Sequence, residues 1–245
     1  MKYMGSKNKI VSDILPIMLS EMNGKSAFVD AFCGGCSVIE NVPPQYRRIA
    51  NDKNKYLIAM WKSLTNDRCQ KPPMRIERDF YCDVRDSYNK GDNRYTDGIK
   101  GWVGFMGSFN GRDFSGGYSG HNVVGSNGKS RDYITENINN TLKQIPRLKG
   151  VEWQSGDYFD IDIPDNSLIY CDIPYKNTKQ YSTSKNFDYE RFYQWCRDMK
   201  EKGHTIFVSE YNMPDDFICV WSKQITNAMH QTNTKKPIEK LYTLI

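Results

Sequence analysis

An acid, a proline and an aromatic residue directly follow one short apolar segment of the chain. The segment 167–171 is predicted to form a buried strand, and Asp172, Pro174 and Tyr175 lie just beyond it. Ligands of open α/β sheets bind outside the carboxyl ends of the strands. A carboxylate there can accept a hydrogen bond from an N–H donor while a flat ring stacks on the same ligand. These residues indicate a site for a flat, N–H-bearing substrate, although alone they fit an ordinary strand-to-loop turn equally well.

A second candidate site lies upstream, where a glycine turn joins a predicted strand to a helix start. The strand at 27–32 is followed by Gly34 and Gly35, and a second strand, 48–51, ends at Asp52. The glycine turn and the acid are separated by close to the roughly 20 residues found in nucleoside-binding βαβ units. In such units the glycines let the backbone approach the ligand, and the acid binds ribose hydroxyls. Because the turn is not G-x-G-x-x-G, the pattern does not favour a dinucleotide.

Together with three further motifs, these sites resemble the DNA adenine-N6 methyltransferases that use S-adenosyl-L-methionine, in the arrangement where the cofactor half precedes the catalytic motif. The resemblance runs from residue 2 to about residue 215 and leaves 65–130 without firm landmarks. In chain order the motifs are the cofactor-lid motif Lys2–Lys7, the F-x-G-G motif within Phe28–Ser37, the ribose acid in Asn51–Asp52, the cofactor-adenine motif Gly156–Tyr158 and the D-P-P-Y-type motif Asp172–Tyr175.

The resemblance implies a Rossmann-like methyltransferase sheet, double-stranded DNA as the partner and a defined set of cofactor-binding residues. Asp30 would lie near the methionine amine, Asp52 would bind the ribose hydroxyls, and Asp157 would meet the adenine amine of the cofactor. The whole implied set is Tyr3, Lys7, Asp30, Phe32, Gly34, Gly35, Asp52, Asp157 and Tyr158.

The resemblance also implies catalytic roles for Asp172, Pro174 and Tyr175. The Asp172 carboxylate and the Ile173 carbonyl would accept the two N6 hydrogens of a target adenine, and Tyr175 would stack on the base. The family has proline where this chain has Ile173, a change that frees φ and bears on rate and target preference more than on reaction type. Because the target atom is hidden in a duplex, the base would have to be flipped out.

Other functions remain open from the sequence. A cytosine-N4 methyltransferase of the same fold usually has Ser at the position of Asp172, whereas an RNA adenine-N6 methyltransferase would share the motifs. A catalytically weak nucleic-acid-binding relative has only Ile173 in its favour. Cytosine-C5 transfer is not expected, because it needs a cysteine nucleophile, typically after proline, and the chain has no Pro-Cys pair.

The composition sets broad limits on partners and location. The 245 residues carry a net charge of +5, which is compatible with nucleic acid without being diagnostic of it. The sequence shows no run of about 18 apolar residues and no apolar leader, so we expect no membrane partner and a cytoplasmic location, in a bacterium or a phage-infected host cell. A monomer or weak dimer is expected.

The cysteines predict structure more than chemistry. Seven cysteines, an odd number without an export signal, indicate reduced thiols. Cys33 and Cys36 have C-x-x-C spacing, but neither a second such pair nor a nearby histidine completes a zinc tetrad. We therefore expect no metal, and we expect these two small side chains to pack beneath the cofactor.

Strand and helix patterns alternate on both sides of an interrupted middle, which predicts one α/β sheet hosting an insertion. The predicted methyltransferase core is 1–64 and 132–245, and the inserted target-recognition region is 65–131. The expected helices are 8–22, a short one from Ser37, 53–64, one around 76–88, 133–145 (stopped by Pro146) and 189–199; the late strands are 205–209, 217–221, 223–228 and 239–244.

Between 100 and 131 the inserted region is dense in glycines, carries several aromatics, and has four basic residues against one acid. A flexible, basic, aromatic segment fits a nucleic-acid contact loop, and the resemblance places target recognition here. We therefore expect Arg112, Lys129 and Arg131 to contact DNA. The alternative is a surface insertion whose aromatics cap the core; those aromatics are Trp102, Phe105, Phe109, Phe114 and Tyr118. The polar stretch 176–186 is expected to be a loop beside the site.

Overall fold

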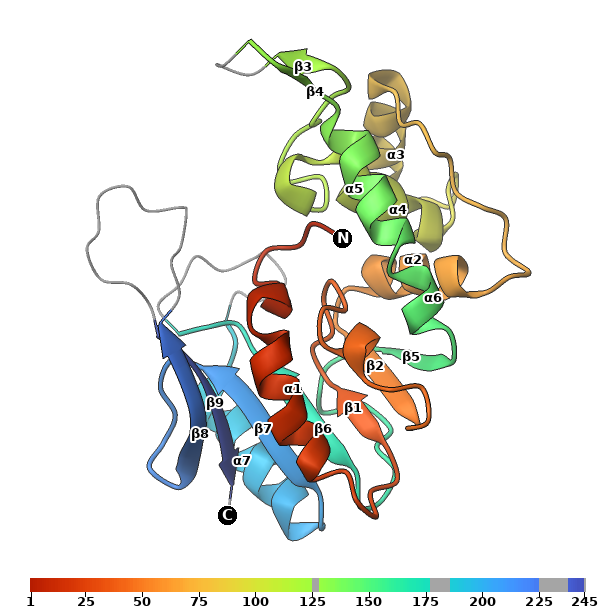
Figure 1. Ribbon diagram of the computed structural model, residues 1–245. Coiled ribbons are helices and arrows are strands. Elements are labelled where there is room, and N and C mark those ends of the chain that lie inside the picture. Colours follow the sequence, from red (N-terminus) through yellow and green to blue (C-terminus); the bar gives the residue numbers. More distant parts are fainter. Residues whose placement is uncertain (125–127, 177–185, 225–237, 245) are drawn as a thin grey trace.

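The central element of the computed structural model is a seven-stranded, mostly parallel sheet (Figure 1). The structure describes residues 1–124, 128–176, 186–224 and 238–244. The strand order is β5-β2-β1-β6-β7-β9-β8, with β9 antiparallel to β7 and β8 antiparallel to β9. The strands are β1 (Phe28–Asp30), β2 (Arg48–Asp52), β5 (Val151–Ser155), β6 (Leu168–Asp172), β7 (Thr205–Glu210), β8 (Phe217–Gln224) and β9 (Ile238–Leu244). The predicted α/β sheet is thereby confirmed.

The central strands are apolar along most of their length because both faces of the sheet are covered. Helix α1 (Val11–Ser20) lies over one face and α7 (Tyr189–Glu201) over the other (Figure 1). Side chains alternate accordingly: Phe28 belongs to the buried cluster that includes α1, and Val29 to the cluster that includes α7. This packing fixes the strand register and hence the positions of the residues at the strand ends.

Apart from α4 (Asp97–Gly107) and η3 (Phe109–Gly111), which were not predicted, the remaining helices agree with the predicted elements except at two boundaries. Only a short 3-10 helix follows Ser37, and Pro146 lies in the first turn of a new helix, where its missing N–H is harmless. The predicted strands 217–221 and 223–228 form a single strand as far as Gln224, and 225–228 lie outside the described residues. The helices are η1 (Lys7–Lys9), η2 (Ile39–Asn41), α2 (Lys55–Thr65), α3 (Arg78–Lys90), α4 (Asp97–Gly107), η3 (Phe109–Gly111), α5 (Tyr133–Leu142) and α6 (Ile145–Leu148).

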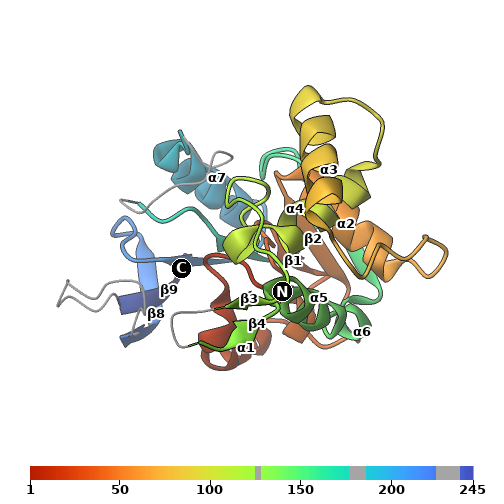
Figure 2. The same ribbon diagram turned by 90° about the horizontal axis from the view of Figure 1, so that it is seen from above.

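The inserted region contains a buried helix where the glycine-rich sequence predicted the start of a flexible contact loop. Helix α4 packs against α2, as the view from above also shows (Figure 2). Its glycines permit close helix contact, since a Cβ at Gly101 would meet the Tyr56 carbonyl oxygen at 2.1 Å. Trp102, Phe105 and Phe114 are buried. These three aromatics therefore cap the core, as the alternative had it, whereas DNA contact by Arg112, Lys129 and Arg131 stays a prediction.

The last part of the inserted region projects from the molecule as a hairpin. Strands β3 (Val123–Val124) and β4 (Ser130–Arg131) form a small antiparallel hairpin at its far end (Figure 1). Phe109, in contrast to the other aromatics, is 47% exposed. The predicted loop at 176–186 falls mainly on 177–185, which lie outside the described residues.

Candidate active site

Two aspartates end adjacent strands at the point where the strand order reverses. From β1 the chain continues to β2 on one side, and it returns later to β6 on the other. Asp30 is the last residue of β1, Asp172 is the last residue of β6, and Ala31 N–H donates to the Tyr170 carbonyl at 3.0 Å. Ligands of such sheets bind at this switch point. The structure thus brings the two sequence-predicted acids to one edge of the sheet.

Asp172 forms a buried ion pair with Lys7, which belongs to the predicted cofactor-lid motif. The Lys7 Nζ lies 2.7 Å from Asp172 Oδ1, and the lysine side chain is only 6% exposed. Burial raises the pKa of Asp172, whereas the Lys7 ammonium lowers it and the Glu239 carboxylate raises it further. The charge of Lys7 therefore helps to keep the Asp172 carboxylate ionised.

Tyr175 is held by contacts on several sides. Its hydroxyl donates to Glu239 Oε2 at 2.5 Å, and its ring meets Tyr211 edge-on with centroids 4.5 Å apart. The Lys7 ammonium lies 4.6 Å from the centre of the Tyr175 ring. Pro174 contributes its carbonyl, which accepts a hydrogen bond from the Tyr189 hydroxyl at 2.9 Å. The ring consequently has one defined orientation next to Asp172.

The glycine turn after β1 is fixed by Asp52. One carboxylate oxygen of Asp52 accepts from Gly34 N–H at 3.0 Å, and the other accepts from Asn54 N–H at 2.8 Å. Burial raises the pKa of Asp52, and these two amides offset the shift. Tyr3 packs directly on the turn, because a Cβ at Gly34 or Gly35 would come within 2.6 Å of its side-chain atoms. The predicted lid motif therefore lies against the predicted cofactor turn.

Asp30 has an unsatisfied oxygen. Asp30 is buried, and its Oδ1 has no hydrogen-bond partner in the part of the chain that the structure describes. Burial raises its pKa well above the ordinary value, and the nearby Asp172 carboxylate adds to the shift. A buried carboxylate of this kind calls for a cationic or hydrogen-bonding ligand.

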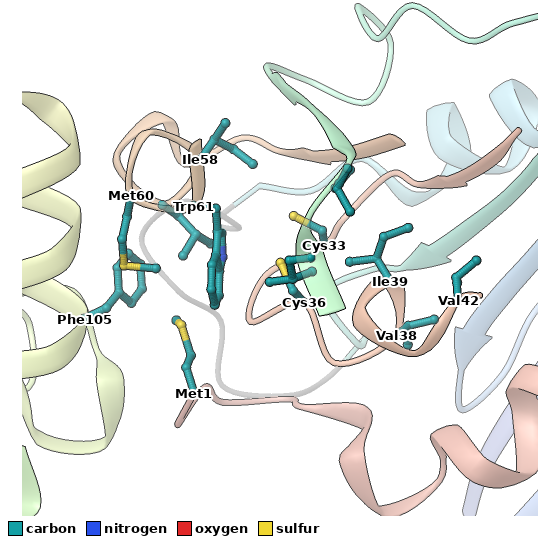
Figure 3. Close-up of a cluster of buried hydrophobic side chains, with 14 of the residues drawn as sticks. Met1, Cys33, Cys36, Val38, Ile39, Val42, Ile58, Met60, Trp61 and Phe105 are labelled. Carbon is teal, nitrogen blue, oxygen red and sulfur yellow. The ribbon is translucent and has the colours of Figure 1, made fainter. Parts of the chain in front are cut away.

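The two cysteines of the C-x-x-C turn are part of the hydrophobic core. Cys33 and Cys36 are buried free thiols, and Figure 3 shows them beside Ile39, across from Trp61 and Phe105. Burial raises the pKa of both thiols, which disfavours the reactive thiolate. Among the described residues no group of three or more His, Cys, Asp and Glu side chains could hold a metal ion.

The other predicted cofactor residues lie beyond the ends of β1 and β5. Phe32 and Tyr158 pack on each other with ring centroids 5.4 Å apart. Asp157 pairs with Lys53 at 3.0 Å and keeps its side chain 32% exposed. Asn51, which the sequence showed only as a neighbour of Asp52, donates to the Ala31 and Gly156 carbonyls at 3.1 Å each and so ties the two strand ends together.

The three predicted DNA contacts differ in their surroundings. Lys129 is exposed on the hairpin. Arg131 is exposed but makes a bidentate ion pair with Glu136, with the shortest N–O distance 2.6 Å. Arg112 is half-buried, and its Nε has no hydrogen-bond partner among the described residues. Arg131 is therefore already ion-paired, with Glu136 in the first turn of α5.

Sequence reasoning missed Glu210, the last residue of β7 next to β6, and Glu239, near the start of β9 on the other side of β7. Both are buried, and burial raises the pKa of Glu210 to about 7. Each lies in an apolar late strand, and an acid in such a strand is the signal that could have found them. Exposed Phe109 was singled out only as one of five aromatics.

Comparison with known families decides between the functions that the sequence left open. The family model described as D12 class N6 adenine-specific DNA methyltransferase matches residues 3–239, nearly the whole chain. The chain belongs to this D12-class family. A comparison with curated proteins found no match. The D12-class protein is thus an enzyme that methylates N6 of adenine in DNA, and its mostly parallel α/β sheet is the Rossmann-like methyltransferase fold.

Family membership confirms the resemblance inferred from the motifs, and nothing favours the cytosine-N4, RNA or catalytically weak alternatives. As a methyltransferase, the D12-class enzyme needs a methyl donor, and DNA is its substrate. Within the described ranges, no helix is both long and apolar enough to cross a membrane.

Proposed function

We propose that this D12-class enzyme transfers the methyl group of S-adenosyl-L-methionine to N6 of a specific adenine flipped out of double-stranded DNA. The observation that carries the proposal is the position of Asp172 and Tyr175, a carboxylate and a ring side by side at the switch point of the sheet. An exocyclic adenine amine is a poor nucleophile, because its lone pair is delocalised into the ring. The site therefore has to change the geometry of that nitrogen.

The charges of the site suit a cationic methyl donor. Asp30 and Glu210 are buried acids that each interact with the partly buried Asp172, and Lys7 is the cation that offsets them. The orphaned Oδ1 of Asp30 fits a methionine ammonium, and a sulfonium adds the positive charge that buried carboxylates favour. When bound, the cofactor supplies the electrophilic methyl group that the N6 lone pair attacks.

The remaining cofactor assignments follow the positions of the side chains. Asp52, already at the Gly34 turn, would bind the ribose hydroxyls, and Tyr3 would cover the cofactor from the lid motif. Asp157 would meet the cofactor's adenine amine. The aromatic surface that Phe32 and Tyr158 form would line the adenine side, with Gly34 and Gly35 giving the backbone its close approach.

Asp172, Pro174 and Tyr175 act on the target base. The Asp172 carboxylate and the Ile173 carbonyl would accept the two N6 hydrogens, which favours a tetrahedral nitrogen whose lone pair points towards the methyl group. Ile173 supplies this carbonyl as proline would, so its side chain does not remove the acceptor. Tyr175, with its hydroxyl held by Glu239, would stack on the base. Most of the acceleration then comes from positioning and local electrostatics.

A basic groove lies between the N-terminal segment and the inserted region, and we assign DNA binding to it and to the hairpin. The groove has a volume of about 490 Å³, and its lining includes Lys2, Arg131, Lys143 and Arg147. Glu136 and Glu40 also line the groove, where they pair with Arg131 and Arg147. Lys2 and Lys143 would contact phosphates directly, Arg131 and Arg147 would do so by exchanging their carboxylate partners for phosphates, and Lys129 would extend the surface along the hairpin. Arg112, with its unpartnered Nε, is the candidate for reading a base. In this proposal residues 1–64 and 132–245 form the catalytic core, and the inserted region 65–131 recognises the DNA target.

Phe109 gives this groove an exposed ring. It follows α4 directly, lines the groove and is followed by Asn110 in a left-handed conformation with φ of 57°. The turn is closely packed, since a Cβ at Gly111 would lie 2.2 Å from the Lys2 carbonyl oxygen. An apolar wedge presented by a rigid turn can enter a base step while the target base leaves the stack. We assign this role to Phe109.

Transfer of labelled methyl from S-adenosyl-L-methionine to a pool of duplexes with random sequence tests the proposal. The enzyme should label adenine N6 in a subset of sequences and should label the matching single strands more slowly. A Phe109→Ala variant should bind the labelled duplexes but give less 2-aminopurine fluorescence when that base replaces the target adenine. Label in RNA alone, or no dependence on this cofactor, would contradict the proposal.

A further inference from the structure

Lys7 contacts the same two groups that the proposed mechanism assigns to the target adenine. Its Nζ lies 2.7 Å from Asp172 Oδ1 and 4.6 Å from the centre of the Tyr175 ring. The first contact is the acceptor assigned to the N6 amine, and the second is the ring assigned to the base. An ammonium is, like the amine, a compact nitrogen that donates hydrogen bonds. Lys7 thus lies where a base amine would have to be.

The backbone and the side chain of Lys7 have different freedom. The main-chain N–H donates to Ser37 Oγ at 3.0 Å, which holds the start of η1 on the core. The four-carbon stem places the ammonium in the site, where it also donates to the Gly5 carbonyl at 3.3 Å. A lysine side chain can rotate its charge away without movement of this backbone.

The groups around the ion pair explain why the site needs a cation when no base is bound. Asp172 is partly buried beside other acids, and without Lys7 its carboxylate would face them with no ion-pair partner among the described residues. The titratable groups that interact with Asp172 come from η1, β1, β6 and its following turn, β7 and β9, and they are Lys7, Asp30, Tyr170, Cys171, Tyr175, Glu210 and Glu239.

We propose that Lys7 belongs to the target-adenine subsite and not to the cofactor subsite: its ammonium holds the place of the N6 amine between Asp172 and Tyr175 and moves aside when the flipped base enters. The proposal rests on the proposed function. Lys7 is then a positioning residue: it keeps the Asp172 carboxylate ionised until that carboxylate accepts a hydrogen bond from the incoming N6 amine. The cofactor role that the family resemblance implied for Lys7 is replaced by this one.

Lys7→Met tests the proposal, because it keeps the length of the side chain and removes its charge. Without the ammonium the pKa of Asp172 should rise. Because activity requires the ionised Asp172 carboxylate, the acid side of the pH–rate profile should then move to higher pH. An opposite charge at this distance shifts an aspartate by one to three units, so the shift should be at least about one pH unit. S-adenosyl-L-methionine affinity measured without DNA should change less than about threefold.

Lys9→Met is the matched control, since Lys9 lies in the same short helix but is exposed. It should reproduce the wild-type pH profile and affinity. Lys7→Arg, which keeps the charge, should retain the wild-type acid limb. If Lys7→Met does not fold, Lys7→Gln goes through the same single-turnover and calorimetric measurements.

Three results would count against the proposal, and they can be told apart. An acid limb that stays in place in an active Lys7→Met enzyme overturns it. A tenfold or greater loss of cofactor affinity with an unmoved limb returns Lys7 to the cofactor subsite. A wild-type enzyme that transfers no methyl to DNA at any pH overturns the proposed function, and this inference with it.

Discussion

Asp172 is the residue on which the chemistry depends most directly. Replacing it with Ala removes an acceptor aimed at the amine but leaves Asp30, Asp52 and the glycine turn in place. We expect single-turnover methylation to fall at least about a hundredfold, or roughly 3 kcal/mol of transition-state stabilisation, on the scale of one lost oxyanion-type partner. Cofactor binding by calorimetry should survive. Near-normal turnover by Asp172→Ala would remove this residue from the mechanism.

Glu210 gives a pH-dependent prediction at the same scale. Burial raises its pKa from 4.5 to about 7, so the folded protein holds a proton that the unfolded chain releases. That contribution to stability is complete below about pH 4.5 and is lost as the pH rises through 7. Glu210→Gln should therefore gain stability relative to wild type across this interval, by about 3 kcal/mol in total. Urea unfolding at pH 5 and pH 8 measures the difference, and equal differences at both pH values would refute it.

At the scale of elements, β2 and the turn after β1 act as one unit through Asp52. Asp52→Ala removes the acceptor of Gly34 N–H and the proposed ribose ligand together. We expect at least a tenfold weaker affinity for S-adenosyl-L-methionine, with turnover at saturation changed far less, because such a contact contributes mainly uniform binding. Asp67→Ala, which removes an exposed acid just after α2, is the control. Calorimetry that shows unchanged affinity for Asp52→Ala would contradict this placement.

Helix α4 gives a second prediction about elements. Gly101→Ala would drive a methyl group against the Tyr56 carbonyl, so the α2–α4 contact must open. We expect a loss of roughly 2 kcal/mol or more in the free energy of unfolding, as in other overpacked contacts. Gly156→Ala, where a Cβ meets nothing within 4 Å, should change stability by less than about 0.5 kcal/mol. Equal stability of both variants would show that α4 does not pack as described.

The elements also show what the sequence could and could not predict. Apolar runs in the sequence predicted the strands that lead to Asp30, Asp52 and Asp172, and the motifs at the ends of these strands predicted the family. The burial of α4 did not follow, because glycines that allow close packing and glycines that give flexibility look alike in a sequence. Contacts of Lys7 with Asp172 and of Tyr175 with Glu239 join residues far apart in the chain, and no local pattern encodes them.

At the scale of the whole molecule, DNA recognition separates from methyl transfer. Phosphate contacts weaken binding to all sequences alike, and each lost contact lowers the slope of affinity against salt by about one. We expect Lys129→Ala to behave in this way. Arg112→Ala should instead relax one position of the recognised site, at a cost of about 1–3 kcal/mol there.

Methylation of a randomised-site duplex pool at two salt concentrations distinguishes the two effects. The control is Lys202→Ala, which replaces an exposed lysine just after α7 and should keep the wild-type salt slope and site preference. If the Lys129 and Arg112 variants also keep wild-type affinity, salt slope and site preference, recognition does not lie in the inserted region.

The most direct test of the central claim is the nucleoside composition of DNA from bacterial cells that lack adenine methylation and express this protein. Mass spectrometry should detect N6-methyladenine in cells with the wild-type enzyme and none in cells with Asp172→Ala at equal expression. N4-methylcytosine in place of N6-methyladenine, or equal N6-methyladenine in both strains, would contradict the assignment of Asp172 and Tyr175 as an adenine-N6 methylation site.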